Sequence, residues 1–371
     1  MLKKIAVILL LINLFSFSKI NVHAAESENK VIDLNIAIEM GVKNSNVLKL
    51  YDDKIVYASK RYQLALAQSY AAKGKGWDTD INLISNKKEE LLYPIQRLNI
   101  ANDLKIEKIN SQNTLKHDIV NAYFKILNQD KQIKLQEDAI ARMNVEISAK
   151  EKQVSLGLDI ANAISNLKIS LNQEEKKLDT LVRNKKSLII EMNTLLGQRP
   201  EEPLVLKDQS LDTKEFIVDD INSLIGIQME KNYSIIKANK DLEESKIEYD
   251  IVKRFSNKAG TNGIEEIEDR ILDREKIIKD KKSELTAKIL KDYNNILNLY
   301  DDVKITELEV IKCEKDMEIT NYKYKLGKIT FLESEKVKSN LDSAVFQNNQ
   351  AALEYFLAVE DFTSDTGLVP Q

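Results

Sequence analysis

The residue types that carry most enzyme chemistry are scarce in this chain of 371 residues, which has two histidines, His23 and His117, and one cysteine, Cys313. A metal site or a Cys–His nucleophile pair needs several such groups brought together, and a single cysteine cannot form an intrachain disulfide. The sequence also has no phosphate-binding glycine loop and no nucleophile elbow. We therefore predict no catalytic residue, no metal site and no cofactor. We expect His117 and Cys313 to lie on helix faces, with His117 exposed to solvent.

The composition favours long helices. Glycine and proline are rare, at 10 and 4 residues, while 31% of residues are charged and 43% are hydrophobic. This balance is typical of helices that bury one stripe and expose a charged face. The formal net charge of −4 gives no electrostatic reason to expect nucleic acid as a partner.

The N-terminus has the pattern of a secretory signal. Lys3 and Lys4 precede the apolar run Ile5–Phe17, and small residues up to Ala24 offer a cleavage site. We therefore assign residues 1–24 as a signal peptide and expect export. The alternative is that the segment is kept as a membrane anchor, although the run is short for a membrane span.

An internal repeat organises the rest of the chain. Tyr123, Gly157 and Gly197 are matched by Tyr293, Gly327 and Gly367, all 170 residues later, whereas earlier positions match 187 residues apart. The first repeat therefore carries 17 residues that the second lacks. We divide the chain into repeat 1 (32–197), a linker (198–216) and repeat 2 (217–367).

Each repeat reads as three helices separated near glycine and proline. The predicted helices are 34–72, 95–156 and 159–196, then 221–257, 265–326 and 329–366, with a short strand at Leu204–Leu206 in the linker. The middle helix would extend roughly 90 Å, so the two shorter helices can lie end to end along it. Leu-Gly at 156–157 and at 326–327 then forms the turn of a long hairpin, where glycine accepts a positive φ.

The third helix of repeat 1 has the spacing of a coiled-coil seam. Apolar residues from Ile164 to Leu195 alternate at intervals of four and three, with interruptions at Glu174 and Lys185. The equivalent seam in repeat 2, from Val337 to Phe362, has smaller and more polar residues. We therefore expect these helices to pack against more than one neighbour. The fold class is all-α, with two tandem repeats of long antiparallel coiled-coil hairpins.

This pattern resembles the TolC-like outer-membrane efflux protein family. The resemblance rests on the order and duplication of short stretches, namely LNIAIEMGVKNSNVLKL (34–50), Ala122-Tyr123, Leu156-Gly157-Leu158, Leu195-Leu196-Gly197 and Tyr324-Lys325-Leu326-Gly327. It implies a homotrimer that forms a hollow helical cylinder. It also implies two partners, a periplasmic-adaptor-like protein and a membrane pump, ATP-driven or other, that powers export.

The resemblance also implies roles for individual residues. The hairpin tips would contact the adaptor through Leu156, Gly157, Leu158, Leu326, Gly327 and Lys328. Tyr324 and Glu333 occupy positions where family members place gate residues. The equivalent of Glu333 in repeat 1 is Ala163, which departs from that pattern. The alternative for both glycines is a purely structural turn.

A second departure lies at the other end of the repeats. The family inserts two membrane strands between its first and second helices, but here the connections are 73–94 and 258–264. Only Ile81–Ile84 offers a short strand, so we expect aqueous loops and a variant without the membrane β-barrel. Trp77 with Leu91, Leu92 and Tyr93 is a candidate membrane-surface contact or cap for the cylinder. We expect location in the cell envelope or at the extracytoplasmic surface, rather than an ordinary outer-membrane channel.

Two functions fit these expectations. The first is a non-catalytic efflux or export component that forms, or docks to, a trans-envelope helical conduit. The second is a secreted coiled-coil structural or interaction protein without a conducting channel. The oligomeric state separates them, because only a ring with a hollow axis can conduct.

Overall fold

A computed structural model describes residues 31–75, 80–157, 161–255 and 262–368. The signal segment 1–24, Trp77 and Leu158 lie outside the described residues. Nearly all of the described chain is helical, and its only strands are two short ones, β1 (Val31–Ile32) and β2 (Val205–Leu206). They pair in parallel, so the strand expected in the linker is confirmed and its partner comes from the start of repeat 1.

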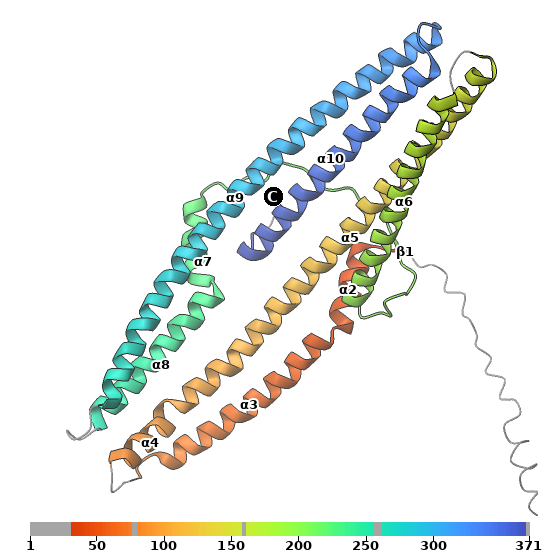
Figure 1. The fold of residues 1–371 in the computed structure, drawn as a ribbon. Coiled ribbons are helices and arrows are strands. Elements are labelled where there is room, and N and C mark those ends of the chain that lie inside the picture. The colour runs from red at the N-terminus through yellow and green to blue at the C-terminus, as the bar shows by residue number, and fades with distance from the viewer. Residues whose placement is uncertain (1–30, 76–79, 158–160, 256–261, 369–371) are drawn as a thin grey trace, which may run out of the picture.

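Two long helices run the length of the molecule, and shorter helices lie end to end along each of them (Figure 1). The helices of repeat 1 are α2 (Leu34–Asn44), α3 (Asn46–Ala72), α4 (Asp80–Leu91), α5 (Tyr93–Ser155) and α6 (Ala161–Leu195). Those of repeat 2 are α7 (Ile221–Lys231), α8 (Tyr233–Phe255), α9 (Asn262–Lys325) and α10 (Phe331–Thr366). The predicted all-α hairpin architecture is confirmed. No helix within these described ranges is long and apolar enough to cross a membrane.

The prediction of one continuous first helix in each repeat is wrong. Repeat 1 breaks at Ser45, whose hydroxyl accepts a hydrogen bond from the Leu48 amide at 3.3 Å. Repeat 2 breaks at the matching position, where the Asn232 side chain accepts from the amides of Ser234 and Ile235 at 3.0 and 3.3 Å. A capping side chain satisfies the unpaired amides of a new first turn and so permits the chain to change direction there.

The loop expected at 73–94 is also corrected. Residues 80–91 form helix α4, which includes the stretch that offered a strand. The Asn86 side chain is buried and donates to the carbonyl of Ala72 at 3.0 Å, and Lys88 pairs with Glu248 of α8 at 2.6 Å. The additional residues of repeat 1 therefore build helix α4, which connects repeat 1 to α8 of repeat 2 at the end of the molecule opposite the tips.

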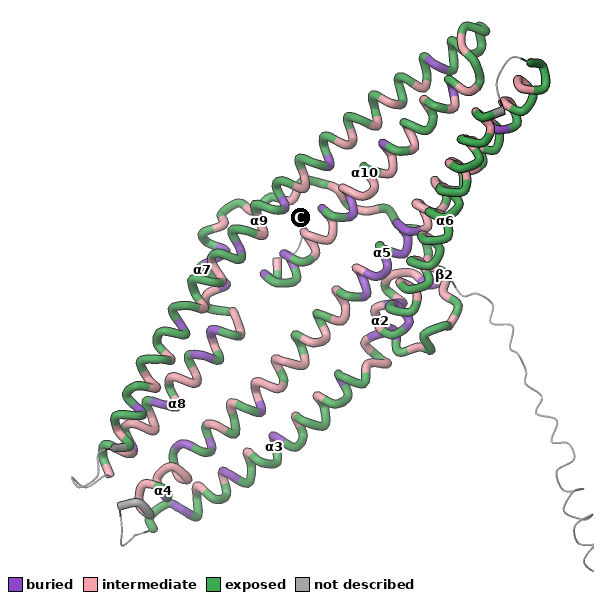
Figure 2. Tube along the Cα trace, in the orientation of Figure 1, coloured by how far each residue is buried: buried purple, intermediate pink, exposed green. Residues whose placement is uncertain are grey.

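One hydrophobic core lies near the middle of the molecule, where α2, α5 and α6 meet, and a second lies where α7, α9 and α10 meet (Figure 2). Tyr123 is fully buried in the first core, and its hydroxyl lies 3.2 Å from the carbonyl oxygen of Ile32 and 2.6 Å from that of Lys207. These contacts join both strands to the long helix. At the matching position of repeat 2, the Tyr293 hydroxyl accepts from the Val218 amide at 3.3 Å. The repeated tyrosine therefore fixes the segment that enters each repeat.

The C-termini of α6 and α10 are capped in the same way. Gly197 and Gly367 have φ of +67° and +65°, as expected for glycines that terminate helices. A side-chain amide from the first part of each repeat caps a carbonyl there: Asn44 donates to Leu196 at 2.8 Å, and Gln228 donates to Thr366 at 2.6 Å. Each returning helix is thus bonded to the helix that opens its repeat.

Candidate functional site

The two hairpin tips lie at the same end of the molecule, as the repeat predicts (Figure 1). In the first tip, α5 ends at Ser155, Leu156 is 73% exposed and Gly157 has φ of +73°. Leu158 lies outside the described residues. An added Cβ on Gly157 would meet no heavy atom within 4 Å. The positive φ that we expected at Gly157 is therefore present.

The second tip is described completely. The amide of Gly327 donates to the Tyr324 carbonyl at 2.9 Å, and the amide of Lys328 donates to the Lys323 carbonyl, also at 2.9 Å. This pair of bonds is a Schellman motif, which requires the φ of +67° at Gly327. Leu326, Gly327 and Lys328 are all exposed. The glycine thus has a structural role, and its neighbours remain accessible.

The two gate candidates have separate local partners. The Tyr324 ring lies edge-on to Phe331, with ring centroids 6.2 Å apart. Glu333 forms a capping box with Thr330: its carboxylate accepts from the Thr330 amide at 2.7 Å, while its own amide donates to the Thr330 hydroxyl at 3.2 Å. The backbone bond from Thr330, and then the bond from its hydroxyl, lower the pKa of Glu333. Glu333 therefore contributes a carboxylate to the N-terminal cap of α10.

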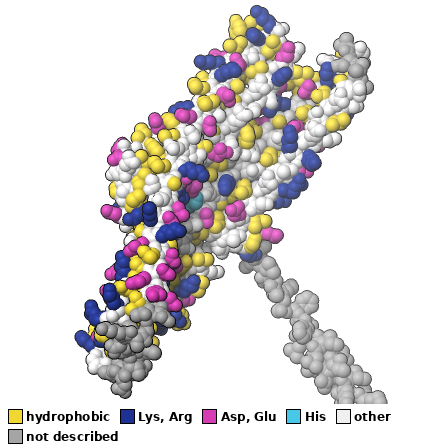
Figure 3. Space-filling model, turned by 60° about the vertical axis from the view of Figure 1, so that its left-hand side comes forward, with side chains coloured by type: hydrophobic (Ala, Val, Ile, Leu, Met, Phe, Trp, Pro, Cys, Tyr) yellow, Lys and Arg dark blue, Asp and Glu magenta, His cyan; other side chains and the backbone are white. Residues whose placement is uncertain are grey.

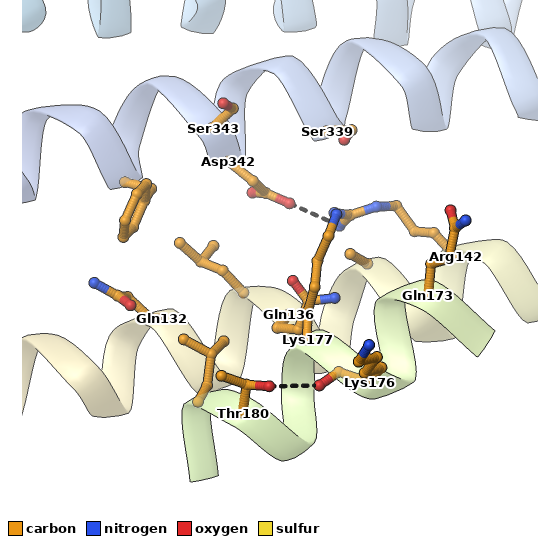
Figure 4. Close-up of a pocket in the computed structure, with 14 residues that line it drawn as sticks. Gln132, Gln136, Arg142, Gln173, Lys176, Lys177, Thr180, Ser339, Asp342 and Ser343 are labelled. Carbon is orange, nitrogen blue, oxygen red and sulfur yellow. Dashed lines mark hydrogen bonds and ion pairs between the residues drawn. The ribbon is translucent and has the colours of Figure 1, made fainter. Parts of the chain in front are cut away.

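A groove separates the α5–α6 hairpin from α10, with a cavity of about 730 Å³ (Figure 4). Leu135, Ala139 and Leu181 from the first hairpin face Phe346 from the second. Arg142 and Asp342 meet across the gap, with Nη1 and Oδ2 2.7 Å apart, and their side chains are 13% and 23% exposed. The ion pair joins the two hairpins partway along their length.

The interruptions in the coiled-coil seam are polar contacts between α5 and α6. Lys185 pairs with Asp130 at 2.5 Å, and Glu174 accepts from Gln136 at 2.7 Å and from Lys177 at 2.6 Å. Partial burial opposes ionisation of Glu174, but the hydrogen bonds from Lys177 and Gln136 lower its pKa overall. The interruptions at Lys185 and Glu174 are therefore sites where polar side chains join α6 to α5.

His117 is not the exposed residue that we expected. Its side chain is 18% exposed, and Nε2 lies 2.6 Å from Asp361 Oδ1 of α10. The expectation failed because an isolated helix does not reveal which neighbour will cover one of its faces. No group of three potential metal ligands occurs among the described side chains.

Sequence reasoning missed Arg142, Asp342 and the contact of His117. Neither partner of the Arg142–Asp342 pair is repeated: Lys312 and Asn172 occupy the equivalent positions. No periodic signal could therefore have identified the pair.

No protein-family model and no curated protein sequence matches this chain. Solved structures do resemble it. CusC has a TM-score of 0.67 and 12% identity, with 90% of this chain and 91% of that chain covered. The outer membrane protein VceC from Vibrio cholerae has a TM-score of 0.65, 13% identity and coverage of 90% and 96%. The Neisseria gonorrhoeae MtrE outer membrane channel has a TM-score of 0.62, 10% identity and coverage of 90% and 88%. The chain has a TolC-like fold.

Proposed function

We propose that this protein is a non-catalytic efflux or export component, which forms or docks to a trans-envelope helical conduit and depends on a partner pump for energy. The observation that carries the proposal is the extent of the structural likeness. It covers 90% of this chain and 91% of CusC, so it includes both hairpins and the segments that join them. In this proposal 32–197 and 217–367 are the two repeating units, and 198–216 links them.

Exposed apolar stripes on the lateral edges support a homotrimer. Seven residues fall on one side of α9, within roughly 100° at 3.6 residues per turn. Each is at least 38% exposed: Leu272, Leu290, Leu297, Ile305, Leu308, Ile319 and Tyr322. On α3, Leu50, Tyr57 and Leu64 recur every seven residues and are 52%, 66% and 60% exposed. Heptad spacing of exposed apolar residues favours pairing with another helix.

The two stripes lie on different surfaces of the chain, so their contact would be head-to-tail. Such contacts close into a ring when the rotation between copies permits it. On the face that Figure 3 brings forward, hydrophobic side chains are interspersed with acidic and basic ones. This distribution fits narrow helix-to-helix seams better than one broad apolar interface.

The tips are the proposed contact with a periplasmic-adaptor-like protein. Leu156, Gly157 and Leu158 would contribute from the first hairpin, and Leu326, Gly327 and Lys328 from the second. Glycine allows a partner backbone to approach closely, and the exposed Leu156 and Leu326 supply apolar area. Tyr324 and Glu333 remain candidates for closing the entrance, because both lie near the second tip. We place the exported protein in the cell envelope or at the extracytoplasmic surface.

The oligomeric state of the mature protein tests the proposal. Light scattering should give the mass of a trimer, and electron microscopy should show a hollow axis. Replacing Leu297 and Leu308 with Glu should break the assembly, whereas the control Asp302→Lys, an exposed α9 position off the stripe, should not. A wild-type monomer or closed dimer would instead support a coiled-coil interaction protein that conducts nothing.

A further inference from the structure

A second cavity lies near the middle of the molecule, where the linker passes between α7 and α10. Its volume is about 550 Å³, which is within the range of small-molecule sites. Its apolar wall combines Phe216 from the linker, Leu224 and Ile227 from α7, and Tyr355, Phe356 and Val359 from α10. It is remote from the tips and shares no lining residue with the groove that contains Arg142.

The charged groups around this cavity are mostly acidic. Asp212 lies 3.7 Å from Lys214, the one basic residue in the described lining. Asp220 caps α7 by accepting from the Asn222 amide at 2.9 Å. Glu215, Asp219 and Glu360 also line the cavity. The cavity therefore has an excess of negative charge beside an apolar wall.

Glu360 is the acid best placed to bind a ligand. It is half-buried, and its carboxylate makes no hydrogen bond or ion pair with the described part of the chain. Burial raises the pKa of Glu360, His117 opposes this effect, and Asp361 adds to it. The imidazole of His117 is 2.6 Å from Asp361 instead. A partly desolvated carboxylate without a partner favours a bound cation.

The aromatic residues of the cavity are held in place. The Tyr355 hydroxyl donates to the Lys214 carbonyl at 2.7 Å and accepts from the Phe216 amide at 2.8 Å. Phe216 also packs edge-on against Phe362, with ring centroids 5.8 Å apart. Buried Tyr355 thus fixes the linker, and the partly exposed rings of Phe216 and Phe356 can attract an organic cation with little ordering on binding.

We infer that this cavity is a binding site for a small amphipathic organic cation, with an ammonium group at Glu360 and an apolar body against Phe216 and Phe356. An anion would meet the surrounding carboxylates. A metal ion is disfavoured, because no group of three suitable ligands occurs among the described side chains. The inference does not depend on the proposed conduit.

The internal repeat provides a comparison within the same chain. At the positions of repeat 1 that match Tyr355, Phe356 and Glu360, the residues are Lys185, Lys186 and Ile190. Both aromatic rings and the acid are therefore absent there, and two positive charges are present. The site belongs to repeat 2 alone, and one binding event is expected per chain.

Calorimetry on the mature protein tests this with (4-phenylbutyl)trimethylammonium as the probe and 5-phenylpentanoate as its anionic counterpart. The cation should bind saturably at one site per chain, and the anion should not. Glu360→Gln keeps the shape of the side chain and should weaken binding by about tenfold, as expected for loss of a partly desolvated charge contact. Glu354→Gln, at an exposed position on the same helix, is the matched control and should leave affinity unchanged.

A second variant tests the cavity without changing its charge. Ile227→Trp would fill it from α7 and should abolish binding, and Ile227 is exposed enough, at 44%, for the fold to accept the change. Circular dichroism should confirm that both variants fold. The inference is overturned if the cation does not bind at millimolar concentration, if the anion binds equally well, or if either folded variant retains wild-type affinity.

Discussion

Substitution of three glycines by alanine tests quantitatively why glycine is needed at particular turns of this chain. Gly327 and Gly197 both have φ of +67°, but an added Cβ would meet different surroundings. At Gly327 no heavy atom lies within 4 Å, whereas at Gly197 the Cβ of Asn44 would be only 2.7 Å away. Gly226, in the middle of α7, has no atom within 4 Å and no positive φ.

These differences give an order of effects on the free energy of unfolding. Gly327→Ala should cost about 1 kcal/mol, because only the left-handed backbone conformation is penalised. Gly197→Ala should cost about 3 kcal/mol, because the clash also displaces Asn44 and weakens its 2.8 Å bond to the Leu196 carbonyl. Gly226→Ala should instead stabilise by about 0.5–1 kcal/mol, because alanine is the better helix former.

Urea unfolding followed by far-UV circular dichroism measures all three at one protein concentration, which keeps any assembly constant. The double variant of Gly327 and Gly197 should be additive, because Gly327 follows α9 at the second tip, whereas Gly197 follows α6 beside Asn44 and the two sites share no contact. A loss at Gly327 equal to that at Gly197 would refute the steric argument. A clear loss of stability on Gly226→Ala would refute the argument from helix propensity.

Three further outcomes follow. Arg142→Ala and Asp342→Ala should each lower the free energy of unfolding by about 1–2 kcal/mol, because the ion pair is mostly shielded from solvent. A double-mutant cycle should give a coupling energy near 1 kcal/mol, and a coupling of zero would contradict this. Burial raises the pKa values of Tyr123 and Tyr355 above about 10, the ordinary pKa of tyrosine. Their contribution to stability should therefore be complete below that pH and be lost as pH rises above it. Tyr123→Phe should reduce that slope in alkaline unfolding curves, and an unchanged slope would argue against it. Thr330→Val should remove the side-chain cap of α10 and cost about 1 kcal/mol of stability. Because the pKa of Glu333 is lowered, the contribution of its carboxylate to the cap should be lost as pH falls. Hydrogen exchange at the second tip measures both effects, and unchanged protection would contradict them.

The inter-hairpin ion pair and the proposed tip contacts can be separated by experiment. Arg142 and Asp342 lie on α5 and α10, well inside the ends of these helices, whereas Leu326 and Lys328 lie at the turn itself. A change at Arg142 should alter how firmly the hairpins hold together. A change at Leu326 should alter partner binding and leave stability nearly unchanged, because that side chain is exposed.

The sequence alone determined the features that depend on local chemistry. The repeat of Tyr123 and Tyr293, the alternating seam and the glycines at 157, 197, 327 and 367 predicted two helical hairpins and the positions of their turns. These signals work because helix periodicity and positive φ are properties of a few neighbouring residues. The breaks at Ser45 and Asn232 were also readable, as polar caps, but the apolar pattern continues across them and concealed the change of direction.

Only the tertiary structure decided which charged and polar groups meet. His117 contacts Asp361, Arg142 contacts Asp342, and α4 joins α8 through Lys88 and Glu248. These partners are far apart in sequence, and each contact depends on how one helix is rotated and displaced against another. Many rotations bury a similar amount of apolar area, so the hydrophobic pattern does not select among them. Packing of the complete set of side chains does, and it also creates the acidic cavity at Glu360, whose walls come from three separate segments.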